Sequence, residues 1–233
     1  ETGHGAQIAN EVIGALPTPR FTLRDGEVFE ECVALDGEGR FVRTDRPADA
    51  LLSAAVRHVE RYLDAPFPDG YRSELLPQLP YWIQAVMGGL DKGVMLFADY
   101  GYPRREFYQA DRDDGTLRAY YRHRVHNDAY LWPGLQDITA SVDFTALAEA
   151  GTNAGFDLAG YTTQANFLLG NGLQERLDEA QARADEATLL RLRNEAKRLT
   201  LPSEMGERFQ VMGFSRDVEF GAAFLFNDLS WRL

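Results

Sequence analysis

The stretch GVMLFADYGYPRREFYQADRDDGTLRAYYRHRVHNDAYLWPGLQDITASVDFT (residues 93–145) decides how the rest of the chain is interpreted. It opens with the apolar run Val94–Ala98, which is too short to cross a membrane and is typical of a fully buried strand. The run stops at Asp99-Tyr100-Gly101, so we expect a carboxylate and a phenol at the carboxyl end of the strand, where open α/β sheets bind ligands. The residues that follow are rich in Tyr, Arg, His and Asp and have little periodicity, which favours a binding loop over about residues 99–145.

Composition narrows the class of protein. The 233 residues are 45% hydrophobic and 26% charged, an ordinary globular mixture that can bury a core. The net charge of −12 argues against a nucleic-acid partner, because phosphate binding needs a basic face, and it favours a basic partner such as an Arg-containing protein segment. The single cysteine, Cys32, excludes an internal disulfide and fits a reducing compartment, so we expect a cytoplasmic protein. No stretch reaches the length of a membrane-spanning helix.

Before the quoted stretch, the patterns predict a strand and an antiparallel insertion. Gly5–Asn10 is typical of a short buried strand, with Glu11 just beyond its carboxyl end. Asp25-Gly26 is a strong hairpin signal and predicts a β insertion over about residues 20–43. Its glutamates Glu27, Glu30 and Glu31 either face a basic substrate or are solvated outer residues, and we favour the second interpretation.

Further elements follow from periodicity and breakers. Pro47 is expected in the first turn of a helix that reaches about Leu63. The apolar face of that helix is predicted to carry Leu51, Ala55, Val59 and Tyr62. Two further helices are predicted: one that starts at Phe144 and is stopped by Gly151, and a long helical extension over about residues 171–200. Strands are predicted at Phe156–Phe167 and Arg208–Ser215. The last segment, Ala222–Trp231, is predicted to be a closing strand or a docked tail.

Three blocks of the quoted stretch carry a family resemblance: Thr116–His126, Pro133–Thr139 and Val142–Thr145. They resemble the MidA-like family of class I S-adenosylmethionine-dependent methyltransferases, whose mitochondrial relatives are protein-arginine methyltransferases that assist complex I assembly. Supporting matches lie at Asn10-Glu11 with Ala15-Leu16-Pro17, at Ser73-Glu74, at Asp99-Tyr100-Gly101 and at Gly206–Phe209. The resemblance implies a Rossmann-like α/β fold, S-adenosyl-L-methionine as cofactor, and a bacterial cytoplasmic enzyme.

One departure from the family pattern matters for the cofactor. Class I methyltransferases hold the donor with a Gly-rich turn after their first strand and an acidic residue that ends the second. The nearest glycine cluster, Gly3-His4-Gly5, precedes a strand, whereas a cofactor turn follows a strand and opens a helix. The chain also begins at Glu1 on a strand-like run. We therefore expect the carboxyl-terminal portion of a longer protein, with Gly5–Asn10 as the fourth strand of the class I sheet.

The chemistry of methyl transfer to arginine assigns roles to the matching positions. Carboxylates hold a guanidinium in a fixed geometry, and a base accepts its proton. We expect Glu11 and Asp137 to bind or deprotonate the acceptor, and Asn10 to contact the donor side. Asp99 and Asp143 are expected to shape the pocket. The other predicted substrate-binding residues are Tyr100, Arg122, His126, Gln136 and Thr139.

Each of these positions has a purely structural alternative. Asn10 could cap the following helix, Asp99 could form a turn, and Asp143 is well placed as an N-cap. Asp137-Ile138-Thr139 could be a strand edge. The basic residues Arg118, Arg122, His123, Arg124 and His126 either pair with these carboxylates or clamp an acidic group on the substrate.

Other chemistries are disfavoured. His123 and His126 are three residues apart, a spacing that suits two metal ligands only on a helix, and nearby Gly and Pro argue against one. We therefore predict no metal. No Gly-x-Ser-x-Gly elbow is present, and Cys32 is expected to be buried in the hairpin, so no serine or cysteine nucleophile is predicted.

The sequence thus predicts one α/β domain over residues 1–233: the carboxyl-terminal half of a class I methyltransferase sheet, with a β insertion and a helical extension. The predicted function of the intact protein is methyl transfer to a protein substrate, with arginine as the leading acceptor. The alternatives are a non-catalytic assembly protein of the same fold and an inactive fragment. A homodimer is a separate expectation, because a second copy of the chain is one candidate to cover an exposed sheet edge. Half a parallel sheet would also leave an exposed edge strand near residues 5–10.

Overall fold

The computed structural model describes residues 3–122 and 124–233, and the chain divides into two compact units. Unit 1 comprises Glu1–Glu11, Pro80–Gly101 and Leu147–Leu233. Unit 2 comprises Val12–Leu79 and Tyr102–Ala146. The β insertion and most of the predicted motif loop therefore belong to the same unit, although they are far apart in the sequence. The expectation of a single domain stays a prediction.

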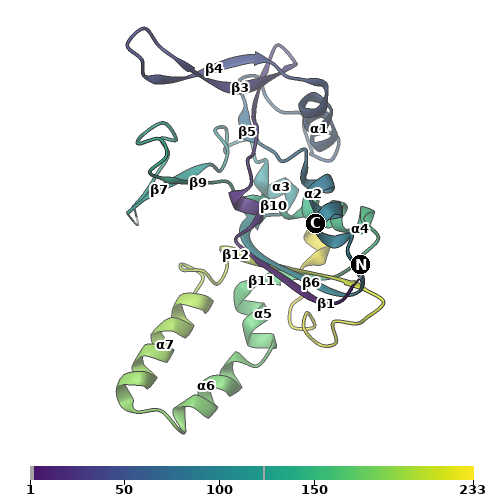
Figure 1. Cartoon of the computed structure of the whole chain (residues 1–233), viewed down its shortest axis with the longest axis vertical. Coiled ribbons are helices and arrows are strands. Elements are labelled where there is room, and N and C mark those ends of the chain that lie inside the picture. Colours follow the sequence, from purple (N-terminus) through teal and green to yellow (C-terminus); the bar gives the residue numbers. More distant parts are fainter. Residues whose placement is uncertain (1–2, 123) are drawn as a thin grey trace. The chain divides into compact units, whose positions relative to one another are not determined.

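Unit 1 is built on a sheet with the strand order β1-β6-β12-β11 (Figure 1). The strands are β1 Gly3–Asn10, β6 Leu90–Tyr102, β12 Phe209–Arg216 and β11 Asp157–Thr163. The first two are parallel, and β12 runs antiparallel to both β6 and β11. Phe97, Met212 and Phe214 are almost completely buried in the middle of the sheet. This α/β arrangement confirms the predicted fold class and the presence of strands at residues 5–10, 94–98 and 208–215. The predicted burial of the first two is wrong: β1 is mostly exposed, and Val94, Leu96 and Ala98 of β6 are only half-buried.

The β1 strand lies at the edge of this sheet. Among the described residues it pairs only with β6, and its side chains are mostly exposed, with Ile8 at 74%. The expected exposed edge near residues 5–10 is therefore present. Gly93 has a φ of +153°, and a Cβ there would overlap the carbonyl of Gly5. Glycine at this position thus lets the two parallel strands approach.

Two helices contribute apolar side chains to unit 1. Ile83 and Met87 of α2 (Leu79–Met87) are completely buried. The α4 helix (Phe144–Asn153) starts where predicted, but Gly151 lies inside it rather than stopping it. A Cβ at Gly151 would overlap the ring of Phe214, so this glycine allows the helix to pack on β12.

Two further sequence predictions in unit 1 are corrected. The predicted strand Phe156–Phe167 ends at Thr163, whose hydroxyl accepts a hydrogen bond from the Asn166 amide and caps α5 (Gln164–Gly170). The single long helix is two helices, α6 (Leu173–Gln181) and α7 (Glu186–Thr200) (Figure 1). Asp185 caps α7 by accepting from the Thr188 amide at 2.8 Å, so a local side-chain signal interrupts the continuous apolar period.

The end of the chain is a docked tail rather than a closing strand. The Leu229 amide donates to the Tyr161 carbonyl at 2.6 Å, and the Thr162 hydroxyl donates to the Asn227 carbonyl at 2.7 Å. Phe224 is buried against Gly160 and Gly213, and a short 3-10 turn, η2 (Ser230–Arg232), ends the tail.

Unit 2 contains a four-stranded antiparallel sheet with the order β4-β3-β2-β5. The strands are β2 Arg20–Arg24, β3 Glu27–Leu35, β4 Phe41–Pro47 and β5 Arg72–Glu74, preceded by the 3-10 turn η1 Ile13–Ala15. The predicted Asp25-Gly26 hairpin is confirmed, and both turn residues have positive φ. Phe21, Leu23 and Val28 are buried on one face in a single cluster with residues of α1 (Ala50–Glu60).

The predicted start of α1 is wrong, and its predicted face is only partly right, because Val59 and Ala55 contact the core whereas Leu51 and Tyr62 do not. Pro47 ends β4, and Asp49 caps the helix by accepting from the Leu52 amide at 2.8 Å. The buried positions are Leu52, Val56 and Val59, whereas Leu51 and Tyr62 are 50% and 55% exposed. Because both apolar sets fit a helical period, only the tertiary contacts select between them.

The motif region is not one loop. It contains a three-stranded sheet with the order β8-β7-β9, together with a short helix and a short strand. These elements are α3 Arg104–Phe107, β7 Arg118–Tyr121, β8 Arg124–His126, β9 Asp137–Thr139 and β10 Val142–Asp143. Strands of three or four residues are too short to produce a readable alternation, which explains the missed prediction.

Candidate functional site

The carboxyl end of β1 carries two of the predicted site residues. The Glu11 amide donates to the Ala98 carbonyl of β6 at 2.8 Å, so the pairing of the parallel strands continues to this residue. Glu11 has a φ of 53°, an uncommon value for a residue with a side chain, and the strand ends there. The Asn10 side-chain amide donates to the Glu11 carboxylate at 3.3 Å, and both side chains are exposed. A linked amide and carboxylate are thus presented at this edge.

Asp99 and Tyr100 lie inside β6, not beyond its end. The strand continues to Tyr102, because β12 pairs along it and places Gln210 opposite Asp99. Asp99 is 2% exposed, and its carboxylate accepts from the Tyr100 amide at 3.0 Å. The Tyr100 ring packs edge-on against Phe209 with 5.4 Å between centroids. Both the expected strand end and the turn alternative for Asp99 are therefore wrong, while the pocket role stays a prediction.

Asp143 is an N-cap, as its structural alternative predicts. One carboxylate oxygen accepts from the Ala146 amide at 3.0 Å, at the start of α4. The other accepts from Nε of Arg104 at 3.2 Å, and the Arg104 side chain is only 4% exposed. Asp143 therefore fixes the start of α4 in unit 2, and a direct role in substrate binding stays a prediction.

The remaining carboxylate, Asp137, begins β9. It is exposed and lies opposite Tyr120 of β7, so the strand-edge interpretation is confirmed. The neighbouring Gln136 side chain donates to the Ala129 carbonyl at 2.7 Å and holds the preceding loop. Thr139 is buried opposite Arg118. The sheet thus presents Asp137 to solvent on a fixed backbone.

Arg122 follows β7 directly, and His126 is the last residue of β8. Arg122 has a φ of 49°, and its guanidinium lies 5.3 Å from the Tyr121 ring centroid. The His126 ring is edge-on to Trp132 at 6.1 Å, and its two nitrogens are buried and have no hydrogen-bond partner among the described residues. His123 lies outside the described residues. Within residues 3–122 and 124–233, no group of three or more His, Cys, Asp or Glu is arranged to hold a metal.

The predicted site residues therefore form two sets. Asn10, Glu11, Asp99 and Tyr100 belong to unit 1. The second set belongs to unit 2 and comprises Arg122, His126, Gln136, Asp137, Thr139 and Asp143.

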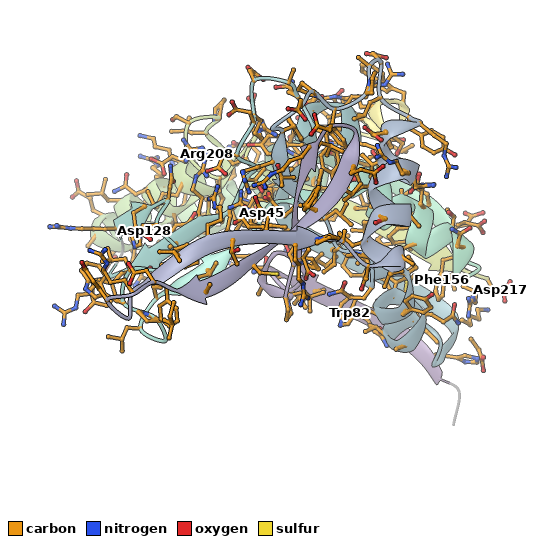
Figure 2. The ribbon with its side chains drawn as sticks, turned by 90° about the horizontal axis from the view of Figure 1, so that it is seen from above. Asp45, Trp82, Asp128, Phe156, Arg208 and Asp217 are labelled. Atoms are coloured by element: carbon orange, nitrogen blue, oxygen red, sulfur yellow. The ribbon has the colours of Figure 1, made fainter. Side chains whose placement is uncertain are left out.

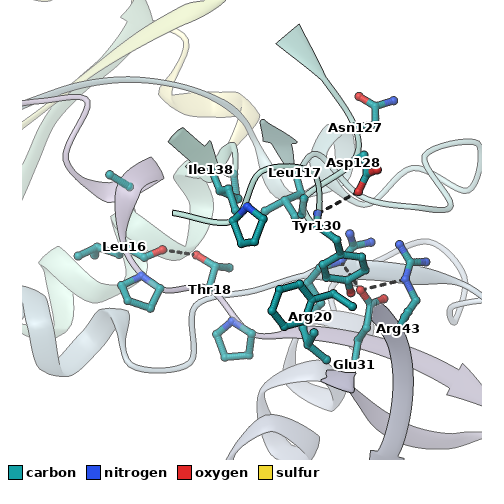
Figure 3. Close-up of a pocket in the computed structure, with 18 of the residues that line it drawn as sticks. Leu16, Thr18, Arg20, Glu31, Arg43, Leu117, Asn127, Asp128, Tyr130 and Ile138 are labelled. Carbon is teal, nitrogen blue, oxygen red and sulfur yellow. Dashed lines mark hydrogen bonds and ion pairs between the residues drawn. The ribbon is translucent and has the colours of Figure 1, made fainter. Parts of the chain in front are cut away.

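A cavity of about 880 Å³ in unit 2 was not predicted from the sequence (Figure 3). One wall is the segment 14–20, which runs from η1 to the start of β2, and another is the β3–β4 hairpin. Figure 3 shows Ile138 and Leu117 on one side, with Glu31 and Arg43 on the other. The lining is mostly apolar and is completed by Val33, Phe41, residues 127–130, Pro133 and Ala140. Its size and character are those of a ligand-binding site.

An ion-pair network lies at one end of this cavity. Glu31 contacts three arginines: Arg72 at 3.0 Å, Arg43 at 3.1 Å and Arg20 at 3.6 Å. The Glu31 side chain is only 5% exposed, so the expectation that it is a solvated outer residue is wrong. The signal was its register: Glu31 pairs with Arg20 of β2 and Asp45 of β4, which places opposite charges on one face.

Two further carboxylates complete the network. Asp45, labelled on this sheet in Figure 2, accepts two bonds from Arg72, at 3.0 and 2.8 Å, and one from Arg24. The hydrogen bonds from Arg72 lower the pKa of Asp45 below its usual value. Asp114 accepts from Arg20 at 2.8 Å and from Arg43 at 3.1 Å. Burial raises the pKa of Asp114, but these two guanidiniums outweigh it and lower the pKa overall.

Glu74, one of the family-matching residues, anchors the motif region. It is completely buried and accepts from the Thr116 amide at 2.6 Å and from the Thr116 hydroxyl at 2.5 Å. The same hydroxyl accepts from the Ser141 amide at 2.9 Å. Gly115 has a φ of +70°, and a Cβ there would overlap the Glu74 carboxylate. Burial raises the pKa of Glu74, against the effect of the Thr116 hydrogen bonds.

The fit to a methyl donor is partial. The β1–β6 edge offers Asn10 and Glu11, polar groups of the kind that face a donor and an acceptor. Gly3 and Gly5 lie inside β1, and residues 3–122 and 124–233 contain no Gly-rich turn that follows a strand and opens a helix. The described residues thus supply groups for one side of a donor site only. No helix in the described part of the chain is long and apolar enough to cross a membrane.

Comparison with protein families gives a match over residues 1–162 to the family described as "Putative S-adenosyl-L-methionine-dependent methyltransferase". Among curated proteins, the chain is 30% identical over 219 residues to the mitochondrial protein arginine methyltransferase NDUFAF7 of Danio rerio. It is 32% identical over 216 residues to the protein of the same name from Homo sapiens. Each alignment covers 89% of this chain but only 46% and 44% of the relative, so the chain spans about half the length of these proteins.

Solved structures give the same family relationship at higher identity. A protein from Burkholderia thailandensis, bound to S-adenosyl-homocysteine, is 38% identical to this chain and superposes with a TM-score of 0.88. A native structure of an uncharacterized protein from the same organism gives the same identity and TM-score. Both cover 100% of this chain, which corresponds to 59% and 61% of the neighbour.

Proposed function

The chain belongs to this family of S-adenosyl-L-methionine-dependent methyltransferases, and from this premise we propose that the intact protein transfers a methyl group to a protein side chain. The observation that carries the proposal is the likeness, over the whole chain, to a structure that binds S-adenosyl-homocysteine. That molecule is the product left when the donor loses its methyl group. The polar edge at Asn10 and Glu11 supports the same reading, because open α/β sheets bind ligands at the carboxyl ends of parallel strands.

Arginine is the proposed acceptor. The name of the mitochondrial relatives assigns them this acceptor, and the net charge of −12 favours a basic segment. A guanidinium is held best by carboxylates in a fixed fork geometry, and it becomes nucleophilic only when it loses a proton. Glu11 and Asp137 are exposed carboxylates at the two predicted acceptor positions. We assign to them binding of the guanidinium and acceptance of its proton.

The test uses the full-length protein that contains this chain. It is incubated with S-adenosyl-L-methionine labelled in the methyl group and with proteins from its own organism, and hydrolysates are analysed for methylated arginine. We expect labelled arginine with the wild type. Asp137→Asn and Glu11→Gln should lower the turnover number about a hundredfold or more if the residue is the base. Matched controls are Asp64→Asn and Glu38→Gln, whose parent side chains are 81% and 73% exposed.

Binding of the donor separates the possible failures. A wild type that binds S-adenosyl-homocysteine but labels no protein contradicts protein methylation. Label on a residue other than arginine contradicts the acceptor but not the class of reaction. A protein that binds neither the donor nor its product, yet assembles with a partner protein, supports the second candidate, a non-catalytic assembly protein of methyltransferase fold.

A further inference from the structure

The cavity of unit 2 combines an apolar lining with an arginine-rich end. We propose that it seats an extended segment of the acceptor protein, which inserts an aliphatic or aromatic side chain between the β3–β4 hairpin and Ile138 and places a carboxylate on Arg43. The inference rests on the proposed function, since it names the surface that would recognise the acceptor next to the methylated side chain. It adds a binding specificity that the family relationship does not supply.

The first support is continuity with the predicted acceptor residue Asp137. Ile138, on one wall of the cavity, is the immediate neighbour of Asp137, and both belong to unit 2. A protein acceptor held at Asp137 has flanking residues that need a surface, and this cavity begins at the next residue.

The second support is the pattern of one face of the hairpin. Residues two apart in a strand, and residues directly opposite in an antiparallel pair, share a face. Val33 pairs with Arg43, and Leu35 pairs with Phe41, so these four side chains lie on the same face. Val33, Leu35 and Phe41 are 55%, 63% and 45% exposed. The apolar side chains lie toward the tip of the hairpin, and Arg43 begins the charged base.

The third support is the charge balance at that base. Arg20, Arg43 and Arg72 contact the buried carboxylate of Glu31, which is 5% exposed. Arg72 and Arg24 contact the buried carboxylate of Asp45, which is 3% exposed. Four cations against two buried anions leave two positive charges, and Asp114 neutralises one of them through Arg20 and Arg43. The Asp114 side chain is 62% exposed, so it can leave for water at small cost. Another carboxylate can therefore replace Asp114 as the ion-pair partner of Arg43.

These features define the occupant. Phe41 and Arg43 are two residues apart in β4, which sets their Cα atoms about 7 Å apart. An extended peptide repeats the same interval between side chains on one face. We therefore expect the docked segment to carry an apolar residue and an Asp or Glu separated by one residue. Burial of a large side chain in a pocket, with a charged contact beside it, is the usual composition of a binding hot spot.

The test is a selection of phage-displayed random dodecapeptides against the full-length protein. We expect enriched peptides to contain the apolar residue and the acid at this spacing. Phe41→Ser and Arg43→Gln should each weaken their binding by about tenfold or more, measured by fluorescence polarisation of labelled peptides. Two controls alter the opposite face of the same strand: Val42→Ser, where the parent is 36% exposed, and Arg46→Gln, whose partner is Glu30. These should bind the peptides as the wild type does.

Several results would overturn the proposal. They are the absence of enrichment, enrichment of the same peptides on the Phe41→Ser variant, and equal loss of binding in the Val42→Ser and Arg46→Gln controls. Thermal melting of all four variants checks that the hairpin stays folded. Peptides that bind the cavity of a wild type without methyltransferase activity would contradict the proposed function alone. Methylation whose KM for the acceptor is unchanged by Phe41→Ser would contradict this inference alone.

Discussion

The central sheet of unit 1 and the four-stranded sheet of unit 2 bury very different side chains. In unit 1, Phe97 and Phe214 pack edge-on with 6.0 Å between ring centroids, and Gly151 allows a helix to approach the second ring. In unit 2, one sheet face is apolar, but the other buries Glu31 and Asp45 among arginines. The first sheet therefore depends on matched volumes and the second on matched charges. We therefore expect the sheet of unit 1 to lose most stability when a buried side chain is made smaller, and the charged face of the unit 2 sheet when a buried charge is removed.

The largest expected effect is the loss of packing in unit 1. Phe214→Ala removes a completely buried ring, and we expect the free energy of unfolding to fall by about 4 kcal/mol. Trp82 and Trp231 belong to unit 1, so urea unfolding followed by their fluorescence measures the change. Phe226→Ala, at a ring that is 51% exposed, is the control. Equal effects of the two substitutions would show that close packing does not distinguish this sheet.

The next effect concerns the charges of unit 2. Asp45→Ala leaves Arg72 with one carboxylate fewer in a buried network, and we expect a loss of about 3 kcal/mol. Trp132 is the one tryptophan of unit 2, and its fluorescence during urea unfolding reports the change. Glu30→Ala breaks the exposed pair with Arg46 on the opposite face and should alter stability little. A small effect at Asp45 would mean that the network is solvated and the comparison between sheets fails.

A smaller effect is expected at the start of α1, which packs on the apolar face of the unit 2 sheet. Asp49→Ala removes the N-cap that accepts from the Leu52 amide, and we expect a loss of about 1 kcal/mol in the same unfolding experiment. Asp64→Ala changes a carboxylate that is 81% exposed and caps no helix, so it should unfold as the wild type does. If both substitutions cost the same, net charge rather than capping explains the loss.

The smallest effect is a change in pH dependence at Glu74. Burial raises the pKa of Glu74 above its usual value of 4.5. The folded chain therefore holds this proton more tightly than the unfolded chain, and the stability contributed by the group is complete below the unfolded pKa and is lost as pH rises through the folded pKa. Glu74→Gln cannot ionise, so its free energy of unfolding should gain on the wild type as pH rises from about 4 to about 8. A constant difference between the two proteins over that range would contradict the raised pKa.

Prediction from sequence succeeds where one local signal decides the structure. The apolar run Val94–Ala98 identifies a strand that pairs with a neighbour on each side. The Asp25-Gly26 turn identifies its hairpin, because both residues need positive φ. It fails where two local signals compete. The apolar period across residues 171–200 predicts one helix, but the Asp185 cap starts a second one.

The candidate site was only partly predictable for a different reason. Family-matching residues identified Asn10, Glu11 and Asp137, and the structure places all three in exposed positions at the end or start of a strand. The cavity depends on pairing between segments that are far apart in the chain. Arg20 and Asp114 are 94 residues apart, and nothing in either local sequence indicates that they form an ion pair.

The β3–β4 hairpin also provides an internal reporter position. Cys32 is the single cysteine of this chain, and it is half-buried rather than buried as predicted. It pairs with Thr44, on the face of the hairpin opposite to Val33 and Arg43. A thiol-reactive fluorophore attached there would lie behind the wall of the cavity and would not occupy it. Its emission would therefore respond to a segment that binds on the other side of the ribbon. A single natural thiol in this position allows site-specific labelling of the chain without any change to its sequence.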